Sequence, residues 1–295
     1  MSPQKPEIYM TLKKKKIGLI IGSGDLAIHC MEKLEILGHE IVILRLPCSQ
    51  IKIQSDVKHI DIQYEKIDEA LSYLKQNSIN DIALVGYLER PVIDVLKASL
   101  GSQRILSKVV PTLKKGDGAI FTAVKKMLID ENFNIVKVQD LLPALTLPPG
   151  TFGSAFEEII KTYEIERGIS IFLDYAKLDV GQSLVFKGGH CLGMETITGT
   201  DEMIKAVINY RKRNYGKSLS GGILIKGSKP KQILDIDTPV IGPNTIKLAQ
   251  EAKLTGLVIE SNKVILVNKE LIIALLEKYN MFLYSTNFFK KNLQC

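Results

Sequence analysis

The stretch Ile17-Gly-Leu-Ile-Ile-Gly-Ser-Gly-Asp25 decides the fold class of this 295-residue chain. Ile17 to Ile21 is a short, continuous apolar run, which is typical of a buried parallel strand. The glycine turn after it leads into a predicted helix, Leu26 to Leu37, which ends at Gly38, and a second apolar run covers Glu40 to Leu44. This β-α-β opening predicts a Rossmann-like α/β domain with a parallel sheet.

The glycine turn after the first strand has two alternative roles. A turn of this kind presents backbone N–H groups to an anion at the start of a helix, and it also serves simply as a tight connection. The dinucleotide fingerprint needs a third glycine where this chain has Ala27, and Arg45 stands where an acidic residue would end the second strand, so NAD is disfavoured. The candidate ligand-binding residues of the turn are Gly22, Ser23, Gly24 and Asp25.

A third buried strand, Asp81 to Val85, is followed by a loop that contains Gly86 and Arg90. Ligands of open α/β sheets bind beyond the carboxyl ends of the strands, so Arg90 is placed to reach a phosphate. The alternative is a surface arginine ahead of a helix over Val92 to Ala98, begun by Pro91.

Lys115 and Asp117 precede an amphipathic helix predicted over Ala119 to Glu131. Lys115 adds a cation, and Asp117 is an N-cap candidate, a role that alone would explain it. A helix over Asp68 to Gln76 and a strand over Ile135 to Val138 complete this half.

The segment from Pro143 to Gly150 interrupts the pattern, because its three prolines and final glycine form neither a helix nor a central strand. We therefore predict an N-terminal domain over residues 1–140, a linker over 141–153 and a C-terminal domain over 154–295.

The second half predicts a mixed α/β domain. Its predicted helices cover Ser154 to Ala176, Thr200 to Tyr210, a segment capped by Asn244, and Lys269 to Tyr279, capped by Asn268; its strands cover Leu184 to Lys187, His190 to Ile197, Gly222 to Lys226, Pro239 to Ile241, Gly256 to Glu260, Lys263 to Val267 and Met281 to Tyr284. Gly188-Gly189 and Ser261-Asn262 predict hairpin turns. Thr200 is an N-cap candidate.

The segment Lys226 to Gly242 carries the residue types that hydrolysis of a phosphoanhydride needs. Lys226 and Lys229 suit phosphate as point charges. Asp235 and Asp237 lie two residues apart, so on an extended backbone they would face one pocket, where carboxylates suit a hard divalent cation or a water that must lose a proton. The alternative is a surface strand of mixed charge.

The bulk composition narrows the function classes. The net charge of +7 suggests anionic partners without choosing among them. Four cysteines and four histidines lack metal-ligand spacing, so zinc is disfavoured and a reducing cytoplasmic setting is expected. No apolar segment reaches bilayer length, and the apolar run after Lys13 to Lys16 is too short for a signal peptide. The basic run Arg211 to Arg213 closes a helix and lacks aromatic platforms, so no nucleic-acid partner is expected.

Six runs taken in order resemble the LpxI-type UDP-2,3-diacylglucosamine pyrophosphatases of lipid A biosynthesis, from about residue 17 to residue 285. They are Gly18-Leu-Ile-Ile-Gly22-Ser-Gly24, Lys115-Gly116-Asp117, Leu178-Asp179-Val-Gly181-Gln182, Glu195 with Gly199-Thr200-Asp201, Lys229-Pro230-x-Gln232, and Asp237-x-Pro239-x-Ile-Gly242.

The resemblance implies a two-domain enzyme of Gram-negative bacteria with a ligand cleft between its domains. It implies cleavage of a lipid-linked UDP-sugar to UMP and the acylated sugar 1-phosphate, lipid X, with Mg²⁺. Asp237 would be metal ligand or base for the attacking water, with Asp235 beside it. The remaining residues expected to bind the substrate are Gly181, Gln182, Glu195, Thr200, Asp201 and Gln232, with Arg90, Lys115, Lys226 and Lys229 neutralising phosphate.

The resemblance also carries expectations about the surroundings of the enzyme. The acyl chains would lie against an apolar wall within Leu141 to Phe152. The protein would be cytoplasmic, in peripheral contact with the inner membrane, and a homodimer.

The chain departs from the family pattern at three positions. Gly118 replaces a second carboxylate after Asp117, and Ile233 and Asp235 stand where the family tends to carry an acidic residue and an arginine. A non-catalytic or weakly active nucleotide- or sugar-phosphate-binding protein on the same scaffold is therefore the main alternative. An NAD-linked oxidoreductase and a basic nucleic-acid binder are disfavoured.

Overall fold

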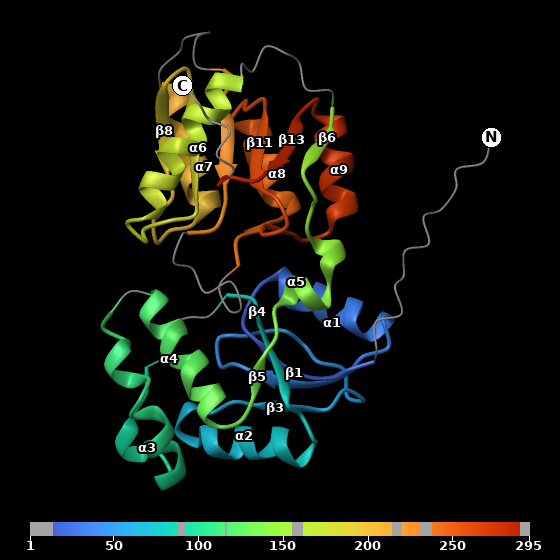
Figure 1. The fold of residues 1–295 in the computed structure, drawn as a ribbon, viewed down its shortest axis with the longest axis vertical. Helices are drawn as coiled ribbons and strands as arrows, with labels where there is room; N and C mark the ends of the chain where they lie inside the picture. The colour runs from blue at the N-terminus through green and yellow to red at the C-terminus, as the bar shows by residue number, and fades with distance from the viewer. Residues whose placement is uncertain are drawn as a thin grey trace, which may run out of the picture.

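The structure, a computed structural model, describes residues 14–87, 92–115, 117–154, 162–213, 220–229 and 238–289. The chain forms two α/β units, one from each half of the sequence (Figure 1). Among the helices of these described ranges, none combines the length and the apolar character that crossing a bilayer needs.

The first unit is a five-stranded parallel sheet in the order β3-β2-β1-β4-β5. Its strands are β1 (Lys16–Ile21), β2 (Glu40–Arg45), β3 (His59–Asp61), β4 (Asp81–Val85) and β5 (Asn134–Ile135). Its helices are α1 (Asp25–Ile36), α2 (Ile67–Gln76), α3 (Leu100–Leu106), α4 (Asp117–Asp130) and α5 (Val138–Leu141), with 3₁₀ turns η1 (Tyr64–Lys66), η2 (Val95–Lys97), η3 (Val110–Thr112) and η4 (Pro143–Leu145). The predicted Rossmann-like parallel sheet is confirmed.

Both faces of this sheet are buried, which explains the continuous apolar run in β1. Ile17, Leu19 and Ile21 belong to the core shared with α1 and α5, whereas Ile20 belongs to the core shared with α2, α3 and α4. Gly18 leaves room for Ile79, whose side chain a Cβ would meet at 2.9 Å.

The second unit is a six-stranded mixed sheet in the order β6-β13-β11-β9-β7-β8, which confirms the predicted mixed sheet. Its strands are β6 (Gly150–Gly153), β7 (Ser183–Lys187), β8 (His190–Met194), β9 (Ile223–Lys226), β11 (Gly256–Glu260) and β13 (Phe282–Thr286), and its helices are α6 (Thr162–Ala176), α7 (Thr200–Arg213), α8 (Pro243–Glu251) and α9 (Lys269–Lys278). Strands β9, β11 and β13 are parallel, whereas β6 and β7 run antiparallel to them.

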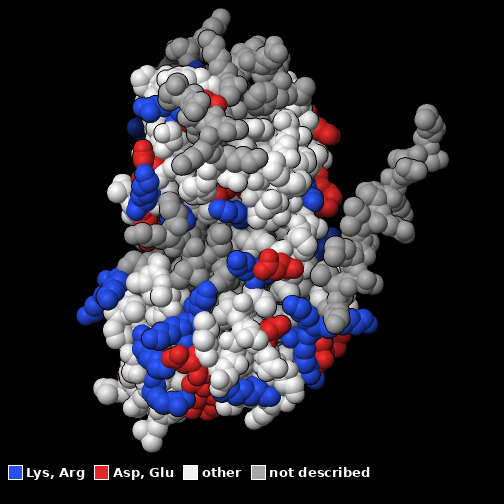
Figure 2. Space-filling model, viewed as in Figure 1, with Lys and Arg blue, Asp and Glu red and all other residues white. Residues whose placement is uncertain are grey.

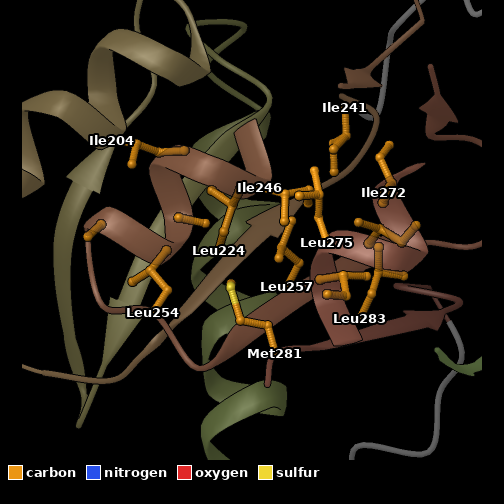
Figure 3. Packing of buried hydrophobic residues seen from close by; sticks show 14 of the residues in the cluster. Ile204, Leu224, Ile241, Ile246, Leu254, Leu257, Ile272, Leu275, Met281 and Leu283 are labelled. Carbon is orange, nitrogen blue, oxygen red and sulfur yellow. The ribbon is translucent and has the colours of Figure 1, made fainter. Parts of the chain in front are cut away.

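Two cores cover the faces of the second sheet. Helices α7, α8 and α9 pack on one face, where Leu224, Leu257 and Leu283 of three neighbouring strands meet them (Figure 3). On the other face α6 buries Phe172 against Phe186 and other residues. The alternation of strand side chains between these cores is the period-2 pattern of a sheet buried on both faces.

The two units contact each other through a small parallel pair, β10 (Val240–Ile241) and β12 (Ile265–Leu266). Ile265 is fully buried in the core of the first unit, and Val240 packs against it. The Gln139 amide donates a hydrogen bond of 3.0 Å to the Thr238 hydroxyl across the same junction.

Several predictions of local structure were wrong. The segment 263–267 forms no hairpin with β11, because Asn262, with φ 59°, donates its N–H to the Leu147 carbonyl and the chain turns toward β10. Within the predicted linker, Gly150–Gly153 pairs with β13 as an edge strand. Val138 begins a helix instead of ending a strand.

The helix predicted over Val92 to Ala98 is only the 3₁₀ turn η2, and the next helix, α3, was missed. Its cap is Ser99, whose hydroxyl accepts from the Ser102 N–H and donates to Asp68 at 2.8 Å. The Ser102 hydroxyl donates to the same carboxylate at 2.6 Å, and these bonds hold the pKa of Asp68 below its usual value. This network depends on a contact 31 residues away, which local patterns do not reveal.

Predicted helix caps had mixed outcomes. The Asn268 side chain caps α9 by accepting from the Leu271 N–H at 3.3 Å, as predicted. Asn244 does not cap α8, because Gly242 is the cap and Pro243 the first helical residue. Thr200 is itself the first residue of α7, and the Gly199 carbonyl accepts the first helical bond from Met203. Residues 155–161 of the helix predicted from Ser154 lie outside the described residues.

Candidate active site

The carboxyl edge of the second sheet brings together residues that are far apart in sequence. The parallel strands β9 and β11 end there at Lys226 and Glu260, and the antiparallel β7 begins there with Ser183 paired to Lys226. The Glu195 N–H donates to the Ser183 carbonyl at 2.9 Å, so the segment after β8 reaches the same edge.

Lys226, Thr200 and Glu195 form a buried network at this edge. The Lys226 ammonium donates to the Thr200 hydroxyl at 2.5 Å and lies 3.7 Å from Glu195 Oε2. The same carboxylate oxygen accepts from Thr200 at 2.8 Å and from the Ser183 hydroxyl. The two charged side chains are only 6% and 12% exposed, so each needs the other and the hydroxyls to offset its loss of hydration.

Tyr175 of α6 borders this network and was missed by sequence reasoning. Its hydroxyl is buried and, among the described residues, has no hydrogen-bond partner. Burial first, and the charge of Glu195 second, raise the pKa of Tyr175 to about 12, so the phenol stays protonated. A Cβ at Gly181 would collide with both this hydroxyl and the Glu195 carbonyl, which explains a glycine there.

The segment after β9 is anchored at two successive residues, Gly227 and Ser228. Ser228 donates its N–H (2.8 Å) and its hydroxyl (2.5 Å) to Glu260, a carboxylate that is 1% exposed and also pairs with Lys263 at 2.5 Å. The Gly227 N–H donates to the Gln182 carbonyl at 3.1 Å. Glu260 was not predicted, because in sequence it only ends an apolar strand.

Lys229 and Asp179 form an ion pair of 2.6 Å beside the network. Asp179 adopts a left-handed backbone with φ 58°. A Cβ at Gly118, near the start of α4 in the first unit, would lie 3.3 Å from the Asp179 carboxylate. The two units therefore approach each other at this point.

Asp201 has a structural set of partners. Its carboxylate accepts from the Asn244 amide at 2.6 Å and from the Thr245 hydroxyl at 2.9 Å, which ties the start of α7 to the start of α8.

In the first unit, the predicted glycine turn lies at the point where the strand order reverses between β1 and β4. Ser23 and Tyr87 bond each other's backbone at 2.8 and 3.0 Å, so the Ser23 N–H is already satisfied. A Cβ at Gly86, with φ 91°, would lie 2.6 Å from the Ser23 carbonyl. Gly24 precedes α1, and Asp25 is its first residue.

Other predicted site residues are only partly described. Arg90, Gln232, Asp235 and Asp237 lie outside the described residues, as does the side chain of Asp117; Lys115 is exposed at the end of the loop before α4. Within the described ranges no three Asp, Glu, His or Cys side chains group as metal ligands. Glu195, Asp179 and Asp201 each engage cations or donors of the protein.

The leucines do not contribute to the apolar wall predicted within Leu141 to Phe152. Leu141, Leu142, Leu145 and Leu147 are each 4% exposed and belong to the two cores, so they offer no surface to a ligand.

The basic run that ends α7 stabilises the fold. Arg211 donates to the Gly221 carbonyl at 2.7 Å and to the Ala252 carbonyl, and Lys212 pairs with Glu251 at 3.0 Å. On the face drawn in Figure 2, basic and acidic side chains are interspersed.

Comparison with known proteins found two family models that match in order. The LpxI N-terminal domain matches residues 16–145, and the LpxI C-terminal domain matches residues 148–284. A protein of Caulobacter vibrioides named UDP-2,3-diacylglucosamine pyrophosphatase LpxI is 26% identical over 269 residues, which cover 91% of this chain and 96% of that protein.

Proposed function

The chain belongs to the LpxI family, and we propose that it hydrolyses the pyrophosphate bond of UDP-2,3-diacylglucosamine to UMP and 2,3-diacylglucosamine 1-phosphate. The single observation that carries this proposal is the ordered match to both LpxI domains over almost the whole chain. The buried network at the carboxyl edge of the second sheet supports it, because Glu195 and Thr200 come from a motif that resembles the family.

The reaction needs the charge of the pyrophosphate neutralised and a water positioned for attack. In our proposal, Asp237 is the metal ligand or the base for this water, and Asp235 assists it. Mg²⁺, when bound, polarises the phosphoryl oxygens. Lys115, Lys229 and Arg90 contact the phosphates.

The described residues support distinct tasks within this proposal. Lys226, neutralised by Glu195 and held by Thr200, fixes the end of β9 from which the chain leads toward Asp237. The proposed substrate-binding set is completed by the glycine turn at Gly22 to Asp25 and by Gly86, Asp117, Gly181, Gln182, Asp201 and Gln232.

The setting is also part of the proposal. The substrate binds in a cleft between an N-terminal and a C-terminal domain, joined near residues 141–153. The enzyme works in the cytoplasm of a Gram-negative cell, in peripheral contact with the inner membrane, as a homodimer.

Phosphorus NMR of the protein with UDP-2,3-diacylglucosamine and Mg²⁺ tests the activity. We expect UMP from the wild type and from Asp56→Ala, a control that removes an exposed aspartate of the first unit, and none from Asp237→Ala. Chelation by EDTA should stop the reaction, and added Mg²⁺ should restore it. Equal turnover by Asp237→Ala would remove that residue from the mechanism.

A non-catalytic binding protein is the second candidate, favoured by the lack of a carboxylate at Gly118, which lies against Asp179. Substrate binding without any release of UMP would establish this candidate and reject the hydrolase.

A further inference from the structure

Four large apolar side chains are exposed on the two loops that carry charged residues of the candidate site. Leu178 and Val180 flank Asp179 and are 71% and 47% exposed. Met194, the last residue of β8, is 41% exposed, and Ile197 of the following loop is 83% exposed, on either side of Glu195 in sequence. Each loop therefore directs a carboxylate to a lysine of the site and leaves apolar neighbours in contact with solvent.

The two loops lie against each other. Gly181 packs so closely on the Glu195 carbonyl that a Cβ would collide with it. A turn closed by the Gly199 N–H and the Thr196 carbonyl, at 3.0 Å, places Ile197 at its tip. The segments that carry the four exposed side chains thus meet beside one polar cluster. In Figure 1 these loops adjoin β8, α6 and α7 at the end of the second unit that faces the first.

Exposed apolar side chains do not by themselves identify a site, and the first unit carries others for comparison, among them Val92, which is 96% exposed. Leu96 and Leu100 are 94% and 85% exposed in the first unit. The backbone around them is fixed by Asp94 and Ser99, whose N–H groups donate to Glu65 at 3.3 and 3.1 Å. None of these contacts involves a candidate site residue.

A ligand that fits the charged cluster with its exposed neighbours Leu178, Val180, Met194 and Ile197 is amphipathic. It has a strongly charged head and apolar tails attached close to it. The leucines between residues 141 and 147 are buried in the cores and offer such tails no surface. We propose that Leu178, Val180, Met194 and Ile197 form the surface on which the acyl chains of the lipid substrate lie. This inference rests on the proposed function and adds the residues that recognise the chains.

The test compares Leu178→Ser/Ile197→Ser with the matched control Leu96→Ser/Leu100→Ser. All four side chains are exposed, so both variants should fold as the wild type does, which circular dichroism checks. Hydrolysis is measured with two UDP-2,3-diacylglucosamines of different acyl length, both used below their micelle concentration. Each additional buried methylene group contributes roughly fourfold to affinity.

For the wild type and the control we expect kcat/KM to rise with acyl length. For Leu178→Ser/Ile197→Ser we expect about a tenfold loss of kcat/KM with the longer substrate, as a higher KM at unchanged kcat, and a weaker dependence on length. An unchanged KM in this variant would overturn the proposal. So would a variant that loses only binding to phospholipid vesicles, because the surface would then serve the bilayer.

Binding of the same two lipids to the wild type and to both double variants, measured by calorimetry without Mg²⁺, separates this proposal from the hydrolase. Length-dependent binding that is lost in Leu178→Ser/Ile197→Ser supports the surface even if no UMP forms. Hydrolysis with length-dependent binding intact in that variant supports the hydrolase and rejects the surface. Failure of the wild type to bind either lipid rejects the surface as well.

Discussion

At the scale of single residues, the Thr200 hydroxyl is central to the buried network because it contacts both Lys226 and Glu195. Thr200→Val should leave both charged groups short of a partner and lower the free energy of unfolding by about 1–3 kcal/mol. Thr200→Ser keeps the hydroxyl and should stay much closer to the wild type. Urea unfolding followed by circular dichroism measures both, and equal midpoints for the Val and Ser variants would contradict this role.

Some residues of the candidate site could be predicted from the sequence, and others could not. Glu195 and Thr200 were predicted through a family motif and Lys226 as a cation suited to phosphate, and the structure brings the three together. Tyr175 and Glu260 were not, because one stands in the apolar stripe of a helix and the other ends an apolar strand. Tyr175 comes close to the Glu195 segment only when α6 packs on the sheet, and Glu260 meets Ser228 only when β9 pairs with β11, which are tertiary events.

At the scale of elements, the loop between α6 and β7 depends on the lack of a side chain at Gly181. Gly181→Ala should collide with the Glu195 carbonyl and the Tyr175 hydroxyl, and should lower the free energy of unfolding by about 1–3 kcal/mol. Gly242→Ser is the control, because a Cβ at this cap of α8 meets open space and serine is a good N-cap residue. Thermal unfolding compares the two variants, and a Gly181→Ala protein as stable as Gly242→Ser would show that the loop can move.

Elements were predictable where the pattern is long and local. The apolar runs of β1, β2 and β4 and the hairpin of β7 and β8 follow from hydrophobic pattern and turn glycines. Strand β12 was assigned to the wrong partner, because the sequence after β11 suits a hairpin, whereas its actual pairing with β10 depends on the Asn262 bond to Leu147. The edge strand β6 was not predicted, because the prolines before it argue against a central strand. Edge positions of a sheet tolerate proline.

At the scale of the whole molecule, the two sheets were predictable but their contact was not. No local pattern in Ile265-Leu266 distinguishes a strand within the second sheet from one that reaches the first unit. The outcome is set by burial, because Ile265 is fully buried among residues of α1 and α5. A residue of one half of the chain thus completes the core of the other half.

The burial of Ile265 in the core of the first unit predicts how the molecule unfolds. Ile265→Ala should lower the free energy of unfolding by about 2–5 kcal/mol and separate the unfolding of the two units, because the lost side chain joins their cores. Ile259→Ala is the matched control, since Ile259 is also fully buried but lies wholly within the core of the second unit. Scanning calorimetry should show one transition for the wild type and the control and two for Ile265→Ala. One transition in all three proteins would mean that other contacts between the units, such as the Gln139–Thr238 hydrogen bond, suffice to couple them.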